Sequence, residues 1–276
     1  MREIDVRHLD RERVICCFAL DGVIVDPGPE SSHRTLLQAL GEEVPRAILL
    51  THIHFDHAGA TGALVRRWPQ VEVWVHERGA RHLVDPSKLV ASATRLYGDD
   101  MQRLWGDVIA VPEENLRVLT GGERAEGFRV AYTPGHASHH VSYLHEATRT
   151  AFVGDVGGVR IDGGPTLPPT PPPDIDLEAW RASLDLVGGW DPARLAVTHF
   201  GAFDDVGAQL DAVREGLGRW GDLARKTDLD GYGERFAAYV HEHSSDERLA
   251  ASYLQAMPPE TLWPGLDRYW QKRAEG

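Results

Sequence analysis

The stretch THIHFDHAGA, residues 51–60, places three histidines and one aspartate within six positions, directly after the apolar run AILL. Residues i and i+2 of an extended segment project from the same side, so His52 and His54 can reach one ion just beyond the strand that AILL predicts. Asp56 and His57 follow where the chain is expected to turn into a helix, and they can face a second position nearby. The spacing therefore predicts a pair of metal sites.

Three further residues of the ligand type stand where an apolar run ends, namely His136 in YTPGH, Asp155 in FVGD and His199 in LAVTHFG. Each is expected at one rim of a sheet, beside the first cluster. A single histidine at a strand end is more often structural, but this ordered combination favours a metal centre. Hydrolytic zinc sites use nitrogen and carboxylate ligands and keep one position open for water. Seven ligands with one shared carboxylate would fill two sites and leave room for a bridging hydroxide.

Composition and charge limit the class of protein. The chain has 276 residues, of which 42% are hydrophobic, so it can build a substantial core. Its formal net charge of −13 argues against nucleic acid as a partner. No secretory leader and no apolar run of ~18–20 residues is seen, so we expect a cytoplasmic protein without membrane contact. The adjacent Cys16 and Cys17 indicate buried strand residues in a reducing compartment.

The chain alternates between strand and helix patterns. A helix is expected over SSHRTLLQALG, and a second begins near Ala58 and is stopped by Pro69. Residues 84–115 read as a helical insert that serves as a lid or a pocket wall, and 163–176 as a long proline-rich loop or linker. Apolar runs predict strands at 13–20, 22–26, 47–50 and 71–76, again between 128 and 155, and finally at 194–198.

With THIHFDHAG, TPGH, FVGD and THFG in this order, the sequence resembles the metallo-β-lactamase-fold hydrolase superfamily over roughly residues 12–204. The early VIVDPGP resembles the turn before its metal motif. The resemblance implies an α/β fold, a four-layer αβ/βα sandwich with the dinuclear site at one edge. We expect a catalytic domain over 1–204 that includes the 84–115 insert. A helical extension over 205–276 would pack on this domain or form a homodimer interface.

The resemblance also implies the distribution of ligands. Asp155 would bridge two divalent ions, with zinc expected and iron or manganese as alternatives. Asp56 would orient the nucleophile and relay its proton to the leaving group. The first ion would be held by His52, His54 and His136, and the second by Asp56, His57 and His199.

Several branches of the superfamily compete for the function. Glyoxalase II-type thioester hydrolases resemble this chain over TPGHASHHVSYL, but GDVGGVR lacks their aromatic continuation and the C-terminal helices lack a clear basic cluster for glutathione. Lactonases share the seven ligands. We therefore expect hydrolysis of a thioester, ester or lactone of a small metabolite. The alternatives are a persulfide dioxygenase with one iron on His52, His136 and Asp155, and a non-catalytic metal-binding protein.

Residues around the motifs are candidates for supporting roles. His140 is expected beside the site by resemblance, and His139 is expected to be exposed. Tyr97 and Trp105 of the insert could line an apolar pocket. The sequence does not decide whether His76, His82 or Lys88 contacts the substrate.

Overall fold

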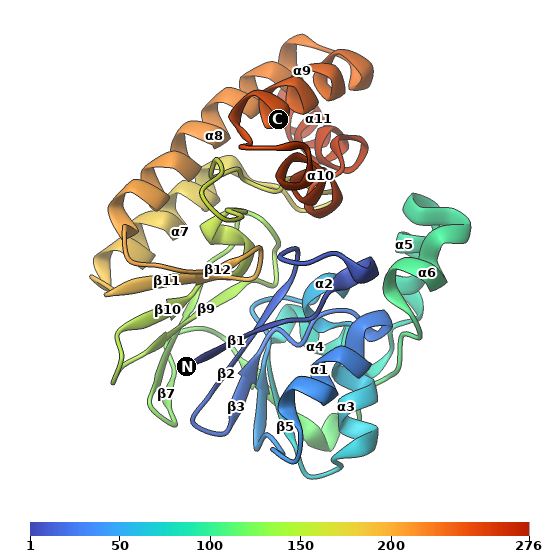
Figure 1. Ribbon diagram of the computed structural model, residues 1–276, viewed down its shortest axis with the longest axis vertical. Coiled ribbons are helices and arrows are strands. Elements are labelled where there is room, and N and C mark those ends of the chain that lie inside the picture. Colours follow the sequence, from blue (N-terminus) through green and yellow to red (C-terminus); the bar gives the residue numbers. More distant parts are fainter. Residues whose placement is uncertain (276) are drawn as a thin grey trace.

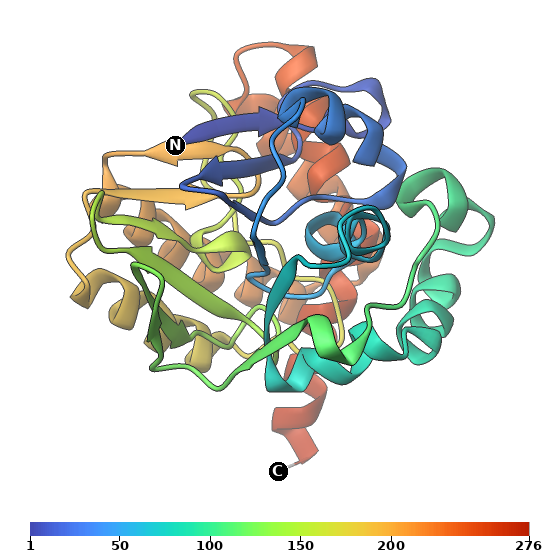
Figure 2. The same cartoon turned by 90° about the horizontal axis from the view of Figure 1, so that it is seen from below.

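Two six-stranded mixed sheets face each other in the computed structural model, which describes residues 1–275 (Figures 1 and 2). The first sheet has the order β1-β2-β3-β4-β5-β6 and the second β12-β11-β10-β9-β8-β7. The strands are β1 (Arg2–Asp5), β2 (Cys16–Leu20), β3 (Val23–Val25), β4 (Ala47–Leu49), β5 (Glu72–His76), β6 (Leu116–Leu119), β7 (Arg124–Ala125), β8 (Phe128–Tyr132), β9 (Val141–His145), β10 (Thr150–Phe152), β11 (Arg194–Val197) and β12 (Gly201–Phe203).

Helices cover the outer faces of both sheets, which confirms the predicted α/β sandwich (Figure 1). Helices of the first half flank the first sheet, while α7 and α8 lie along the second. Within residues 1–275, no helix combines the length and the apolar character needed to cross a bilayer. The helices are α1 (His33–Leu40), α2 (Phe55–Ala58), α3 (Thr61–Arg67), α4 (Glu77–Val84), α5 (Ser87–Tyr97), α6 (Met101–Trp105), α7 (Leu177–Gly189), α8 (Val206–Lys226), α9 (Leu229–His243), α10 (Glu247–Ala256) and α11 (Pro259–Glu275).

The alternation of side chains along the strands divides the core into two parts. Cys16 belongs to the cluster between the sheets, and its neighbour Cys17 belongs to the cluster beneath α1 and α3. Both thiols are free and buried, as the sequence predicts. Phe18 and Phe152 pack edge to face at 5.4 Å across the sandwich, and this contact joins the two sheets.

The direction of the strands places the candidate ligands at one rim. The strands β3 to β6 run parallel, and so do β10 and β11. The carboxyl ends of β4, β10 and β11 therefore lie on the same edge, where each strand leads directly into a ligand-bearing loop. The loop after β8 reaches this edge through Gly135, whose φ of +131° and close approach to Trp180 leave no room for a side chain.

Several predicted boundaries were wrong. The helix expected from Ala58 is two helices, and α2 already begins at Phe55, so Asp56 and His57 lie within its first turn. The strand at 194–198 is not the last, because β12 follows it. The short strands β1, β6 and β7 were not predicted. They carry few apolar residues in regular alternation, and pairing with a neighbouring strand stabilises them.

The insert and the C-terminal helices take up distinct positions. The helices α5 and α6 form a hairpin that contains no fully buried residue. The helix α11 lies against the proline-rich loop, where a Cβ atom added to Gly265 would stand 2.1 Å from the carbonyl oxygen of Thr170. The 163–176 segment is thus an ordered loop held by the C-terminal helices.

Candidate metal centre

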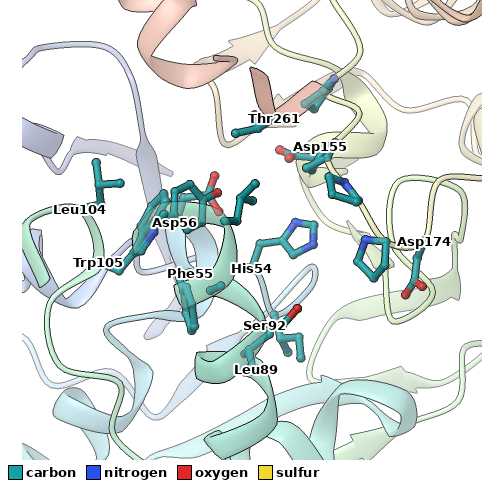
Figure 3. A pocket seen from close by; sticks show the side chains of 18 of the residues that line it. His54, Phe55, Asp56, Leu89, Ser92, Leu104, Trp105, Asp155, Asp174 and Thr261 are labelled. Carbon is teal, nitrogen blue, oxygen red and sulfur yellow. The ribbon is translucent and has the colours of Figure 1, made fainter. Parts of the chain in front are cut away.

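The structure brings all seven candidate residues together at the rim of the sandwich. His54, Asp56 and Asp155 are labelled in Figure 3. His52 and His54 lie in the loop after β4, and α2 supplies Asp56 and His57. The other three follow later strands: His136 lies between β8 and β9, Asp155 in the 3-10 turn Gly154–Gly157 after β10, and His199 directly after β11.

The first group contains His52, His54, His136 and Asp155. His54 Nδ1 lies 2.9 Å from His52 Nε2 and 3.0 Å from His136 Nε2. The Oδ2 atom of Asp155 lies 3.3 Å from His136 Nε2 and 4.0 Å from His52 Nε2. Three ring nitrogens and one carboxylate oxygen thus converge on one position.

The second group contains Asp56, His57 and His199. His199 Nε2 lies 3.3 Å from Asp56 Oδ2, and His57 Nε2 lies 3.8 Å from the same oxygen. The Oδ1 atom of Asp155 stands 3.2 Å from His57 Nε2 and 3.7 Å from His199 Nε2. Asp155 therefore directs one carboxylate oxygen toward each group.

Two buried polar atoms of the site lack hydrogen-bond partners, although they face each other at 3.2 Å. Within residues 1–275, neither His57 Nε2 nor Asp155 Oδ1 makes a hydrogen bond. An unpaired buried polar atom is costly, at roughly 1–3 kcal/mol, so two of them facing one position fit a ligand that both can bind. Imidazole and carboxylate donors suit zinc, iron and manganese. These residues fit a pair of divalent cations.

Hydrogen bonds fix the rings of His136 and His199 with Nε2 toward the site. His136 Nδ1 contacts the carbonyl oxygen of Pro169 at 2.9 Å, and His199 Nδ1 contacts that of Val14 at 2.6 Å. A carbonyl oxygen only accepts, so both Nδ1 atoms carry the proton and both Nε2 atoms are free to bind a cation.

Asp26 holds the ring of His57 directly and that of His52 through Thr51, and it was not predicted as a site residue. This fully buried carboxylate accepts hydrogen bonds from Thr51 N (2.8 Å), Thr51 Oγ1 (2.7 Å) and Thr198 Oγ1 (2.8 Å), and His57 Nδ1 lies 2.9 Å from its Oδ2. Because Thr51 donates its hydroxyl proton to Asp26, its oxygen accepts from His52 Nδ1 at 3.1 Å. The signal for Asp26 was its place after the apolar run of VIVDPGP, where a ligand-type residue ends a strand.

The electrostatic environment differs between the two groups. Burial lowers the pKa of His52 and His136, and it lowers the pKa of His54 to about 4, so these rings are neutral at pH 7. Burial also acts on His57, but the carboxylates of Asp155 and Asp56 outweigh it and raise the pKa of His57. The first group therefore binds a cation without losing a proton, whereas cation binding to the second group displaces one.

Two neighbouring histidines surround the cluster without joining it. His140 Nδ1 lies 2.9 Å from Thr133 Oγ1, and its ring stacks over His52 at 5.1 Å. His139 is half-buried, so its predicted exposure was wrong. Its Nδ1 accepts a hydrogen bond from the Ile53 amide at 3.4 Å, so the loop between β8 and β9 lies against the loop after β4.

A cavity of about 1040 Å³ opens above the two groups. The α5–α6 hairpin, which includes Tyr97 and Trp105, forms one wall, as predicted for the insert. The proline-rich loop and the start of α11 form another. Of the three residues whose contacts were open, His82 and Lys88 line the cavity, whereas His76 stacks on Tyr132 at 4.5 Å.

Comparison with known proteins places this geometry in context. The model of the metallo-beta-lactamase superfamily matches residues 20–199. The metallo-beta-lactamase fold-containing protein ST1585 of Sulfurisphaera tokodaii is 33% identical over 147 residues, which cover 50% of this chain and 53% of that protein. A hydroxyacylglutathione hydrolase of Xanthomonas euvesicatoria is 31% identical over 158 residues, which cover 56% of this chain and 50% of the enzyme. The chain thus spans about half the length of these relatives.

Solved structures agree with this fold. The crystal structure of ST1585 from Sulfolobus tokodaii has a TM-score of 0.73 at 23% identity, over 96% of this chain and 97% of that one. TTHA1623, solved in a di-iron-bound form, has a TM-score of 0.55 at 26% identity, over 72% of this chain and 93% of that one.

Proposed function

Because the chain belongs to the metallo-beta-lactamase superfamily, we propose that it is a dinuclear metal-dependent hydrolase that cleaves a thioester, ester or lactone of a small metabolite. Zinc is the cation that we propose, although the di-iron form of TTHA1623 makes iron the first alternative. The two free buried cysteines support a reducing compartment, and we propose the cytoplasm. The catalytic unit would span 1–204, with 205–276 as its helical extension.

The observation that carries the proposal is the position of Asp155. Its Oδ2 faces the histidines of the first group and its Oδ1 faces those of the second. A carboxylate with both oxygens directed toward separate nitrogen groups is the arrangement that two neighbouring cations require. We therefore assign His52, His54 and His136 to one cation, Asp56, His57 and His199 to the other, and Asp155 to both.

Bound cations would supply a hydroxide nucleophile near neutral pH and polarise the carbonyl group of the substrate. The protein's own contribution centres on Asp56. Burial would raise the pKa of Asp56, but the charges of His57 and His199 lower it, so the carboxylate is ionised. Its side chain is 21% exposed and lines the cavity, so it can accept the proton of the attacking water and pass it to the leaving group.

The position of His54 favours this function over a mononuclear dioxygenase. A single iron on His52, His136 and Asp155 would leave His54 outside the coordination sphere. Instead, His54 Nδ1 lies within 3.0 Å of both His52 Nε2 and His136 Nε2. The names of the hydroxyacylglutathione hydrolases among its relatives further support hydrolysis of a thioester.

The test is hydrolysis of a panel of acyl thioesters, aryl esters and lactones by metal-free and zinc-loaded protein. We expect turnover only with metal, and a loss of at least about 100-fold in kcat for Asp56→Asn. Asp174→Asn is the matched control, because Asp174 lines the same cavity outside the two groups. Equal turnover with and without metal would contradict the proposal, and oxygen uptake with a persulfide substrate would establish the dioxygenase instead.

A further inference from the structure

The cavity has an aromatic wall beside Asp56. Trp105 packs against Tyr97 at 5.2 Å and against Phe55 at 6.2 Å, and the ring of His8 stacks on its other face at 5.5 Å. All four side chains line the cavity, and Leu96 beside them is 41% exposed. Phe55 and His8 are buried beneath this wall, whereas Tyr97 and Trp105 are half-buried and Leu96 is exposed. The open parts of these three side chains are apolar surface that the fold leaves uncovered, so a substrate with an apolar or aromatic group would gain by covering it.

A different part of the same cavity is basic. Arg78 and Arg81 of α4 and Lys88 at the start of α5 line it, whereas Arg95 lies at the other end of α5, next to Leu96 and Tyr97. Within residues 1–275, the cavity is lined by two carboxylates outside the metal groups, Glu77 and Asp174. Within residues 1–275, Arg78, Arg81 and Lys88 have no carboxylate within 4.0 Å. On a chain with a net charge of −13, several unpaired cations around one cavity form a local site for an anion.

Contacts locate this basic side relative to the metal groups. Arg78 lies over the ring of Tyr132 at 5.6 Å, and Tyr132 donates a hydrogen bond to the carbonyl oxygen of Ser138. Ser138 in turn donates to Asp174 Oδ2 at 2.5 Å. In Figure 3, Asp174 and Trp105 lie on opposite sides of His54. The basic side and the aromatic wall therefore flank the candidate metal centre.

We infer that the substrate is amphiphilic. One end carries an aromatic or other apolar group that lies on Leu96, Tyr97 and Trp105. The other end carries a carboxylate or phosphate that Arg78, Arg81 and Lys88 bind, and the bond to be cleaved lies between the two ends. The inference rests on the proposed function only for the nature of that bond, because the two-ended binding site exists whether or not the protein is a hydrolase.

A matched pair of fluorescent probes tests this inference without any turnover. The aromatic anion 8-anilinonaphthalene-1-sulfonate and the neutral N-phenyl-1-naphthylamine share one ring system and differ in the sulfonate. With zinc-loaded protein we expect the anion to bind at least about tenfold more tightly than the neutral probe, as one charge-assisted contact allows. Equal affinities would overturn the inference.

Variants test which residues contact each end of the probe. Arg81→Gln/Lys88→Gln should weaken binding of the anion about tenfold and leave the neutral probe unchanged. The control Arg34→Gln/Arg66→Gln removes the same charge from exposed positions outside the cavity and should change neither. Trp105→Ala should weaken the binding of both probes. A similar loss in the control, or no effect of Trp105→Ala, would overturn the inference.

Competition distinguishes the two anions. Displacement of the bound sulfonate probe by 1-naphthyl phosphate indicates a phosphate substrate, and displacement by 1-naphthoate indicates a carboxylate. Displacement by neither would overturn the inference. Failure of the hydrolase proposal would look different, because probe binding would keep its dependence on Arg81 and Lys88 while no ester, thioester or lactone was cleaved.

Discussion

Replacing Asp26 by asparagine should release the second cation while the fold persists. The carboxylate of Asp26 is fully buried and accepts from Thr51 N, Thr51 Oγ1 and Thr198 Oγ1 at 2.7–2.8 Å, with His57 Nδ1 at 2.9 Å. Asparagine keeps the size and one accepting oxygen, but its amide nitrogen donates. With that amide facing it, His57 must accept at Nδ1 and therefore carry its proton on Nε2.

A protonated Nε2 cannot bind a cation, so the loss falls on the group formed by Asp56, His57 and His199. Changes to residues that orient a metal-binding histidine lower metal affinity by about 10–100-fold. We expect a loss of this size at one of the two sites. Stability of the metal-free protein should fall by about 1–3 kcal/mol, because a buried acceptor is lost.

Zinc affinity of metal-free protein, measured by competition with a chromophoric chelator, checks this prediction. Thr198→Val is the matched control, because it removes one hydrogen bond to the same carboxylate and leaves the contact between Asp26 and His57. It should lower stability by about 1 kcal/mol and leave both zinc affinities within about twofold of the wild type. Two sites of wild-type affinity in Asp26→Asn would refute the proposed control of the His57 tautomer.

Three further changes probe the cluster and its support. Asp155→Ala should weaken the binding of both cations. Loss of only one cation in elemental analysis would mean that Asp155 is not shared between the two sites. Gly135→Ala should destabilise the protein by about 2 kcal/mol in urea unfolding, because its Cβ would lie 2.3 Å from Trp180 Cα, whereas Gly163→Ala, in open space, should have no measurable effect. Acidification should destabilise the metal-free protein, because the pKa of His54 in the folded state, about 4, lies below its value in the unfolded chain. The free energy of unfolding should therefore be highest above pH ~6.5 and should be about 2 kcal/mol lower at pH 5. His54→Gln should remove that part of the pH dependence of the unfolding midpoint, and an unchanged pH dependence would contradict it.

The sequence predicts the metal-binding residues better than the edge strands of the two sheets. The i, i+2 spacing of His52 and His54 and the placement of later ligands after apolar runs follow from local rules, and the structure brings all seven residues together. Strands such as β7, Arg124–Ala125, were missed because pairing in the folded sheet, and not the local pattern, defines them. Asp26 was missed as a site residue because its partners, Thr51 and Thr198, are distant in sequence.

The layout of the cavity also depends on tertiary contacts. The apolar residues of the insert have helical spacing, which is usual for core residues, so the sequence offered Tyr97 and Trp105 only as candidates for an apolar pocket. The structure places both in the lining of a cavity. Likewise, Arg78 and Arg81 look like ordinary surface residues in the sequence, and contact with substrate was left open for Lys88. Their shared position in the lining of the cavity gives them a common role in the inferred binding of an anion.

The content of metal per chain tests the central claim most directly. Protein purified without added metal or chelator, analysed by elemental analysis and then titrated with zinc after metal removal, should hold close to two cations per chain. Saturation with two equivalents of zinc, together with metal-dependent hydrolysis, is the predicted result. Saturation at one cation per chain, with iron as the native metal, would contradict the dinuclear hydrolase.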